Sequence, residues 1–123
     1  MKVLNYSTYG HTIILLEKKL TAQKICSIYT YLYSANDDVE KNVILDMSAV
    51  LCIDNYAIEE LRNLVLAFSK PEHPLVVISA STQIVSVLHE FEDEISHYKD
   101  LKDYVMHNPQ IFSKLTVKSK YML

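Results

Sequence analysis

The sequence predicts an α/β domain in which a mixed, mostly parallel sheet begins with an N-terminal β-hairpin and helices pack against it. Two short apolar runs without polar alternation, "NVILDM" and "LVVIS", are typical of strands covered on both faces. Each run is followed by a segment with apolar residues at helical spacing, and strands that alternate with helices imply crossovers between parallel strands. With 123 residues, 50% of them hydrophobic, the chain can bury one compact core.

The opening of the chain predicts the hairpin. Residues 2–9 alternate loosely between apolar and polar side chains, and the only glycine of the chain, Gly10, supplies a turn. The run "TIILLEKKL" follows as a stronger strand candidate. These two strands are therefore expected to pair in antiparallel fashion.

Residues 21–35 can be interpreted as a helix or as a strand. Apolar residues recur at helical spacing, yet Tyr29, Tyr31 and Tyr33 alternate at period two. The length of about fifteen residues and a capping-type residue, Thr21, favour the helix. On a helix the three tyrosines point in different directions, which favours core and rim packing over a binding stripe.

The segment "LDMSAVLCIDNYAIEELRNLVLAF" predicts a central strand, a link and a long helix. We expect the strand to end near Asp46 and "SAVLCI" to connect it to the helix. Asp54 is a favourable N-cap, and Glu59 and Glu60 are expected in the first turn, where the helix dipole favours carboxylates. The apolar stripe of this helix is Ile58, Leu61, Leu64, Val65 and Phe68.

The rest of the chain predicts three shorter elements after the strand "LVVIS". The segment "TQIVSVLHEF" has helical spacing, residues 93–98 can hold a short edge strand, and "KDLKDYVMH" is a final helix that stops at Asn108 and Pro109. The domain is therefore assigned to residues 1–108. Residues 109–123 form a C-terminal tail with three lysines.

Composition excludes several classes of function. The net charge of -3 provides no basic field for nucleic acid, and the apolar runs are far shorter than the roughly 20 residues of a membrane helix. A signal-peptide pattern is also absent, so we expect a cytoplasmic protein. With a single glycine, the chain cannot form a phosphate-binding P-loop or a GxGxxG fingerprint, and no cofactor is expected.

Candidate catalytic and metal-binding residues are few. Cys26 and Cys52 lack CxxC spacing and the five histidines lack metal-ligand spacing, so we expect reduced thiols and no metal. The apolar neighbours of Cys52 suggest a buried, inert thiol. Asp46 and Asp54 could form an acidic pocket at the carboxyl edge of the sheet, but an enzyme would also need a nucleophile-base pair, a glycine loop or a metal set.

The central segment resembles the STAS domain of anti-sigma factor antagonists. In that family the strand carries a Leu-Asp-aliphatic-Ser signature, and the following helix begins with Asp-Ser-Ser/Thr-Gly. The strand signature is matched by "LDMS", which contains Asp46 and Ser48. The helix motif falls on Asp54, Asn55, Tyr56 and Ala57. The resemblance covers residues 12–106 in element order and implies a single STAS-like domain.

The resemblance also implies a phosphorylation switch, and this chain departs from it. In the family a protein kinase phosphorylates a hydroxyl residue at the start of the helix, which places a charge of about -1.5 to -2 in the partner interface. Asn55 has no hydroxyl, and the phenol of Tyr56 stands farther from the backbone than a serine hydroxyl. The usual glycine is replaced by Ala57. We therefore expect a protein that binds its partner without this switch.

The resemblance implies a non-catalytic module that binds a protein partner through the helix from Asp54 to Arg62, including Glu59. The partner would be an anti-sigma factor of the serine-kinase type, and its capture would regulate transcription indirectly. Tyr56 is the candidate anchor, because an exposed aromatic ring often dominates an interface. Alternatively, the chain is the STAS subunit of a transport ATPase, such as a lipid ABC-type complex, for which the missing hydroxyl is no obstacle.

Overall fold

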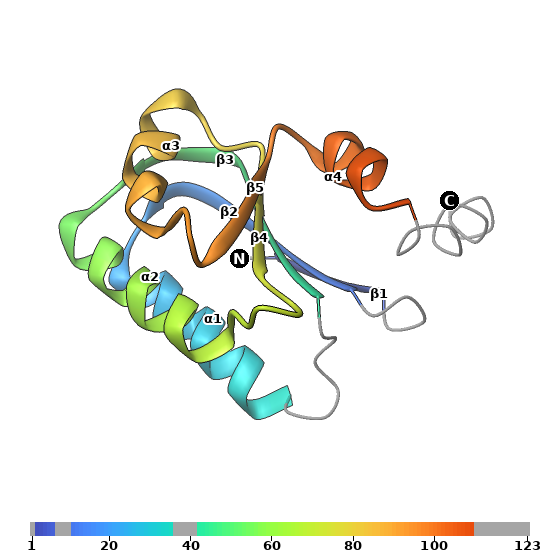
Figure 1. Ribbon diagram of the computed structural model, residues 1–123. Helices are drawn as coiled ribbons and strands as arrows, with labels where there is room; N and C mark the ends of the chain where they lie inside the picture. Colours follow the sequence, from blue (N-terminus) through green and yellow to red (C-terminus); the bar gives the residue numbers. More distant parts are fainter. Residues whose placement is uncertain (1, 7–10, 36–41, 110–123) are drawn as a thin grey trace.

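The computed structural model describes residues 2–6, 11–35 and 42–109, and over these ranges the expected order of elements is confirmed (Figure 1). The elements are β1 (Lys2–Tyr6), β2 (His11–Leu20), α1 (Ala22–Ala35), β3 (Asn42–Ile53), α2 (Asn55–Phe68), β4 (Leu75–Ile78), α3 (Thr82–Leu88), the 3-10 helix η3 (His89–Phe91), β5 (Ile95–Tyr98) and α4 (Leu101–His107). Of the tail expected at residues 109–123, all but Pro109 lies outside the described residues.

The strands form one mixed sheet in the order β1-β2-β3-β4-β5. β1 pairs with β2 in antiparallel fashion, and every other neighbouring pair is parallel. The expected N-terminal hairpin and mostly parallel sheet are both confirmed. Each parallel pair is joined by a helix, because parallel strands need a crossover connection.

Helices cover both faces of the sheet, which explains the unbroken apolar strands. In Figure 1, α1, α2 and α3 lie on one side and α4 on the other. Successive residues of a strand point to opposite faces. Leu45 and Val77 accordingly belong to the larger core under α1–α3, whereas Ile44 and Val76 belong to a smaller core with Tyr104 of α4.

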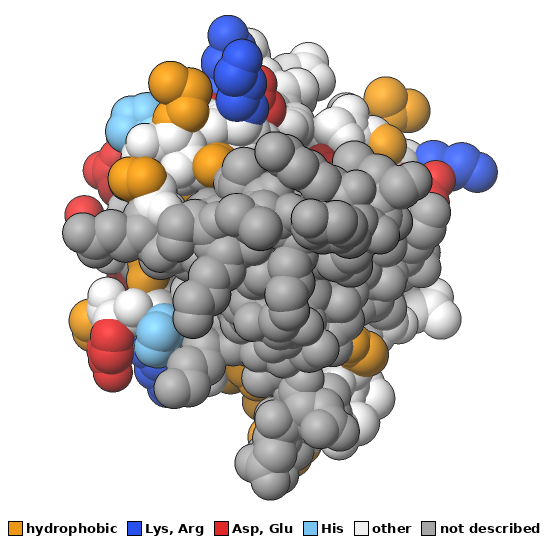
Figure 2. Space-filling model, turned by 90° about the vertical axis from the view of Figure 1, so that its right-hand side faces the viewer, with side chains coloured by type: hydrophobic (Ala, Val, Ile, Leu, Met, Phe, Trp, Pro, Cys, Tyr) orange, Lys and Arg blue, Asp and Glu red, His pale blue; other side chains and the backbone are white. Residues whose placement is uncertain are grey.

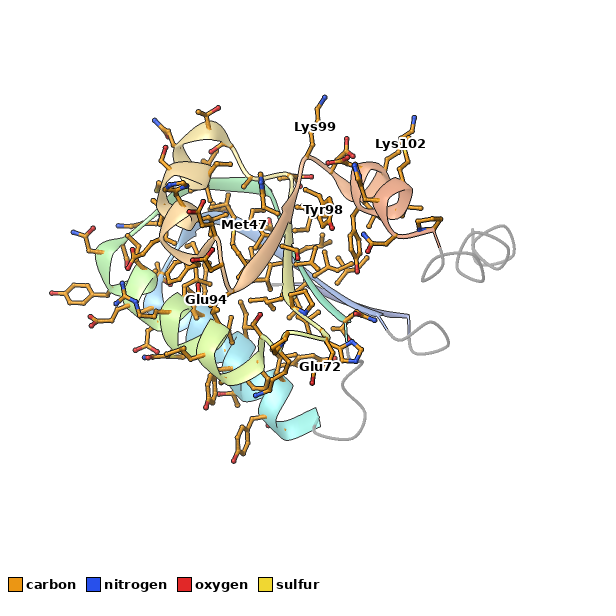
Figure 3. All side chains as sticks on the ribbon, viewed as in Figure 1. Met47, Glu72, Glu94, Tyr98, Lys99 and Lys102 are labelled. Carbon is orange, nitrogen blue, oxygen red and sulfur yellow. The ribbon has the colours of Figure 1, made fainter. Side chains whose placement is uncertain are left out.

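The α4 side of the molecule carries polar side chains at its outer edge. Lys99 and Lys102 project away from the start of α4, and Tyr98 precedes them at the end of β5 (Figure 3). Figure 2 looks onto this side and shows Lys and Arg side chains at its upper margin. Among the described residues, no helix combines the length and apolar content needed to cross a membrane.

The central strand is longer than predicted. β3 continues through "SAVLCI" to Ile53, so the expected link was wrong. Only Ile44–Asp46 of β3 pair with β4, and the later residues pair with the second half of β2. Two register shifts between β2 and β3, each with one extra residue on β3, mark bulges in this ribbon, and Lys18 of β2 lies beside the second one with φ 58°. Figure 1 shows β2 and β3 bending away from β4 toward the start of α2.

The ambiguous segment after β2 is a helix. Thr21 caps it as expected, since its Oγ1 accepts a hydrogen bond from the backbone N–H of Lys24 at 3.3 Å. Tyr31 packs partly against the core, while the rings of Tyr29 and Tyr33 stack at 6.0 Å on the outside. Tyr29 also meets Phe68 of α2 edge-on at 5.2 Å, so this part of α1 helps to hold the two helices together.

Candidate partner-binding site at the start of helix α2

Asp54 builds a fixed corner between the β2–β3 ribbon and α2. Its carboxylate Oδ1 accepts a hydrogen bond from the backbone N–H of Ala57 at 2.7 Å, as an N-cap residue does. Its own N–H donates to the carbonyl of Leu20 at 3.1 Å. The predicted N-cap is therefore confirmed, and the same residue ties the helix to the end of β2.

The side chains around this cap are exposed. Asn55 is exposed, and Tyr56 has 78% of its surface accessible to solvent. Just before the cap, Leu51 is 73% exposed at the end of β3. Sequence reasoning missed Leu51, because it placed this residue in a link. No feature of the sequence marks its exposure, because Leu51 lies in the unbroken apolar run from Val50 to Ile53.

Ala57 occupies the position where the family motif has glycine, and it is fully buried. It therefore offers no surface to a partner, which corrects its assignment as a contact residue. Its burial follows from helix geometry, because Ala57, Leu61 and Leu64 lie on one face and all three are in the core. Ala57 therefore supports the corner from inside the core.

The charged residues of α2 are arranged differently from the prediction. The helix begins at Asn55, so Glu59 and Glu60 lie in its second turn and the first turn carries no acidic residue. Arg62 forms an ion pair with Glu90, and its guanidinium lies 5.8 Å from the centre of the Phe91 ring. Arg62 thus links α2 to η3, whereas Glu59 is exposed.

Asp46 and Ser48 both lie within β3 and are joined by a local hydrogen bond. The Asp46 Oδ1 accepts a hydrogen bond from the backbone N–H of Ser48 at 2.9 Å. Asp46 pairs with Ile78, the last residue of β4, whereas Asp54 follows the far end of β3. The expected acidic pocket was therefore wrong, because the unpredicted second half of β3 separates the two carboxylates. No metal-binding group of three His, Cys, Asp or Glu occurs within the described ranges.

Both cysteines are free and exposed, so the expectation of a buried Cys52 was wrong. The thiol of Cys26, on α1, donates a hydrogen bond to the Glu60 carboxylate of α2, with 3.7 Å between Sγ and Oε2. Local desolvation, the charge of Glu60 and this hydrogen bond raise the pKa of the Cys26 thiol. A thiol held protonated in this way is a poor nucleophile.

Comparisons with solved structures identify the fold. SpoIIAA, an anti-sigma factor antagonist in its unphosphorylated form, is 11% identical, with 89% of this chain and 96% of that chain covered and a TM-score of 0.67. A candidate anti-sigma factor antagonist from Thermotoga maritima is 14% identical, with coverage of 80% and 86% and a TM-score of 0.66.

A third structure extends the comparison to another group of proteins. A DUF3478 protein from Shewanella loihica with a SpoIIAA-like fold is 16% identical, covers 76% of this chain and 79% of its own, and has a TM-score of 0.56. No family model and no curated protein match the sequence. At these identities the similarity concerns the fold, and the chain has the SpoIIAA-like fold expected of a STAS domain.

Proposed function

We propose that this chain is a non-catalytic, cytoplasmic protein-binding module that captures an anti-sigma factor of the serine-kinase type and so regulates transcription indirectly. The main support is the exposed, rigid corner at the start of α2, where Tyr56 stands beside the Asp54 cap. The similarity in fold to anti-sigma factor antagonists supports this choice of partner.

The corner has the physical properties of a binding site. Tyr56 and Leu51 are among the most exposed large hydrophobic side chains of the described residues, and the cap holds the backbone between them in place. A rigid aromatic residue loses little conformational entropy on binding and often contributes much of the affinity. Asn55 adds an amide that can both donate and accept hydrogen bonds.

The residues of the corner support binding without phosphorylation. Asn55 and Tyr56 stand where the family motif has its hydroxyl residues, and neither is a serine or threonine. The same observation supports the alternative partner, a transport ATPase of the lipid ABC type, since such a subunit needs no phosphorylation switch. The two partners differ in identity, so one capture experiment distinguishes them.

The experiment is affinity capture of the tagged protein from its native cell extract, read by mass spectrometry. The test variant is Tyr56→Ala. The matched control is Tyr33→Ala, because Tyr33 is also 71% exposed but lies on α1. A kinase-like anti-sigma factor that is captured by the wild type and the control, and lost with Tyr56→Ala, supports the proposal.

Two results would change the proposal. Capture of a transport ATPase in the same Tyr56-dependent manner would move the function to the alternative. Equal capture by the wild type and Tyr56→Ala would show that the corner is not the contact.

A further inference from the structure

A second surface lies between the outer sides of α1 and α2. An open groove of about 640 Å³ is lined there chiefly by Cys26, Tyr29, Glu60, Asn63, Leu66 and Ala67. Its apolar lining is open to solvent, since Leu66 is 66% and Tyr29 is 37% accessible. Exposed apolar side chains that line a groove between helices are typical of sites that accept another helix.

The basic residues of the two helices do not neutralise this groove. α1 has one, Lys24, whose Nζ donates to the backbone carbonyls of Glu17 and Lys19 at 3.0 and 2.7 Å. α2 has one, Arg62, which forms the ion pair with Glu90. Both cations are therefore engaged outside the groove.

The acidic residues of α2 are left without a basic partner in the part of the chain that the structure describes. Glu60 accepts a hydrogen bond only from the neutral thiol of Cys26, and Glu59 is exposed beside it. These carboxylates lie toward the start of α2, whereas Leu66 and Ala67 lie toward its end. The groove is thus negative at one end and apolar at the other.

We infer that this groove binds an amphipathic helix of a protein partner that carries Lys or Arg at one end of an apolar stripe. The basic end would lie against Glu59 and Glu60, and the apolar stripe would cover Leu66 and Tyr29. α2 has 14 residues and is about 21 Å long, which matches four turns of a bound helix. This surface shares Glu59 with the expected partner-binding segment and extends beyond it to the end of α2, without using the Asp54 cap or Leu51.

The test uses a fluorescein-labelled helical peptide of about 18 residues, with leucines along one face and lysines in the turn at one end of that leucine face. A second peptide has glutamate in place of every lysine. Binding to the full-length protein is measured by fluorescence anisotropy. We expect the basic peptide to bind at least about tenfold more tightly than the acidic one, because only its charge complements the groove.

Substitutions in the protein test where the peptide binds. Glu60→Lys should lower the affinity for the basic peptide at least about tenfold. The control is Glu72→Lys, which changes the net charge by the same amount but lies in the turn between α2 and β4 (Figure 3). It should change the affinity for the basic peptide less than about twofold. Leu66→Ser should also weaken binding. Since Leu66 is exposed, this change tests the apolar part of the groove without disturbing the core.

The native thiols give an independent readout. When the basic peptide is bound, alkylation of Cys26 by iodoacetamide should be slower, whereas the alkylation rate of Cys52 should stay the same. The reason is that Cys26, and not Cys52, lines the groove. Three results would overturn the inference. They are an equal affinity for both peptides, an equal loss of affinity for the basic peptide with Glu60→Lys and Glu72→Lys, and a Cys26 that the bound peptide does not protect from alkylation. Protection of Cys26 by raising the protein concentration alone would also overturn it, since the occupant would then be a second copy.

Discussion

At the scale of single residues, Thr12 is the clearest misfit in the core. Its side chain is fully buried in β2, and its Oγ1 has no hydrogen-bond partner within the described residues. A buried hydroxyl without a partner costs free energy, because it loses its hydrogen bonds to water. We expect Thr12→Val to raise the free energy of unfolding by about 1 kcal/mol, measured by urea denaturation.

The control for this prediction is Thr12→Ser, which keeps the hydroxyl and removes a methyl group. It should lower the free energy of unfolding by about 1 kcal/mol. If Thr12→Val were instead clearly less stable than the wild type, the hydroxyl would have a partner in solution.

Tyr104 gives a prediction for alkaline pH. It is the buried residue of α4, and burial, followed by the nearby Tyr98, raises its pKa from 10 to about 12. Between these two values the unfolded chain loses the phenolic proton and the folded chain keeps it. The stability contributed by the neutral phenol is therefore fully present below pH 10 and is lost as the pH rises toward about 12.

The measurement is the free energy of unfolding of the wild type and of Tyr104→Phe as a function of pH. Tyr104→Phe keeps the ring against Ile44 and Val76 but removes the titrating group. We expect the wild type to lose on the order of 2 kcal/mol more than the variant across this range. Parallel pH curves would show that Tyr104 ionises in the folded protein as it does in the unfolded chain.

At the scale of elements, the two roles of Asp54 can be separated. Asp54→Ala removes the cap and should lower the free energy of unfolding by about 1 kcal/mol, because the N–H of Ala57 loses its acceptor. Asp54→Asn keeps a capping oxygen but removes the charge, so we expect a change of only a few tenths of a kcal/mol. Chemical denaturation followed by circular dichroism measures both values.

A large loss of stability in Asp54→Asn would contradict this prediction, because the charge would then matter more than the hydrogen bond. If Asp54→Asn is stable, it becomes the variant with which to test whether the carboxylate contributes to partner binding.

The sequence predicted those features that depend on residues close together in the chain. It did not predict the features that depend on contact with a strand or helix far away in the chain. The caps of α1 and α2 follow from Thr21 and Asp54, whose side chains contact backbone groups three residues away. The second half of β3 exists because β2 pairs with it, and this information lies more than thirty residues away in the sequence. For the same reason Leu51 and the contact of Arg62 with Glu90 could not be anticipated.

At the scale of the whole molecule, the order of elements predicted the mixed sheet, and the resemblance carried by "LDMS" and the Asp54 motif predicted the STAS fold that the SpoIIAA-like architecture confirms. Fully buried runs such as β4 need helices on both faces, and the chain provides them on either side of the sheet. The candidate site was located only in part. Its cap and its exposed tyrosine were predicted, but Ala57 proved to be buried and Asp46 lies apart from the corner.

The whole module is expected to lack the phosphorylation switch of the family. Incubation of the wild-type protein with ATP and a serine kinase of the anti-sigma factor type should leave its intact mass unchanged. Asn55 has no hydroxyl to phosphorylate. The phenol of Tyr56 lies at the end of a long, exposed side chain, farther from the backbone than the serine hydroxyl that such a kinase modifies. SpoIIAA serves as the positive control for kinase activity.

A matched variant tests whether the missing serine is the cause. Asn55→Ser combined with Tyr56→Ser restores hydroxyls at the first two positions of α2, where backbone N–H groups and the helix dipole favour a phosphate. We expect this variant to gain one phosphate. A phosphate on Ser48 or Tyr56 of the wild type would contradict the prediction, and it would mean that the module can be phosphorylated without a serine or threonine at the start of α2.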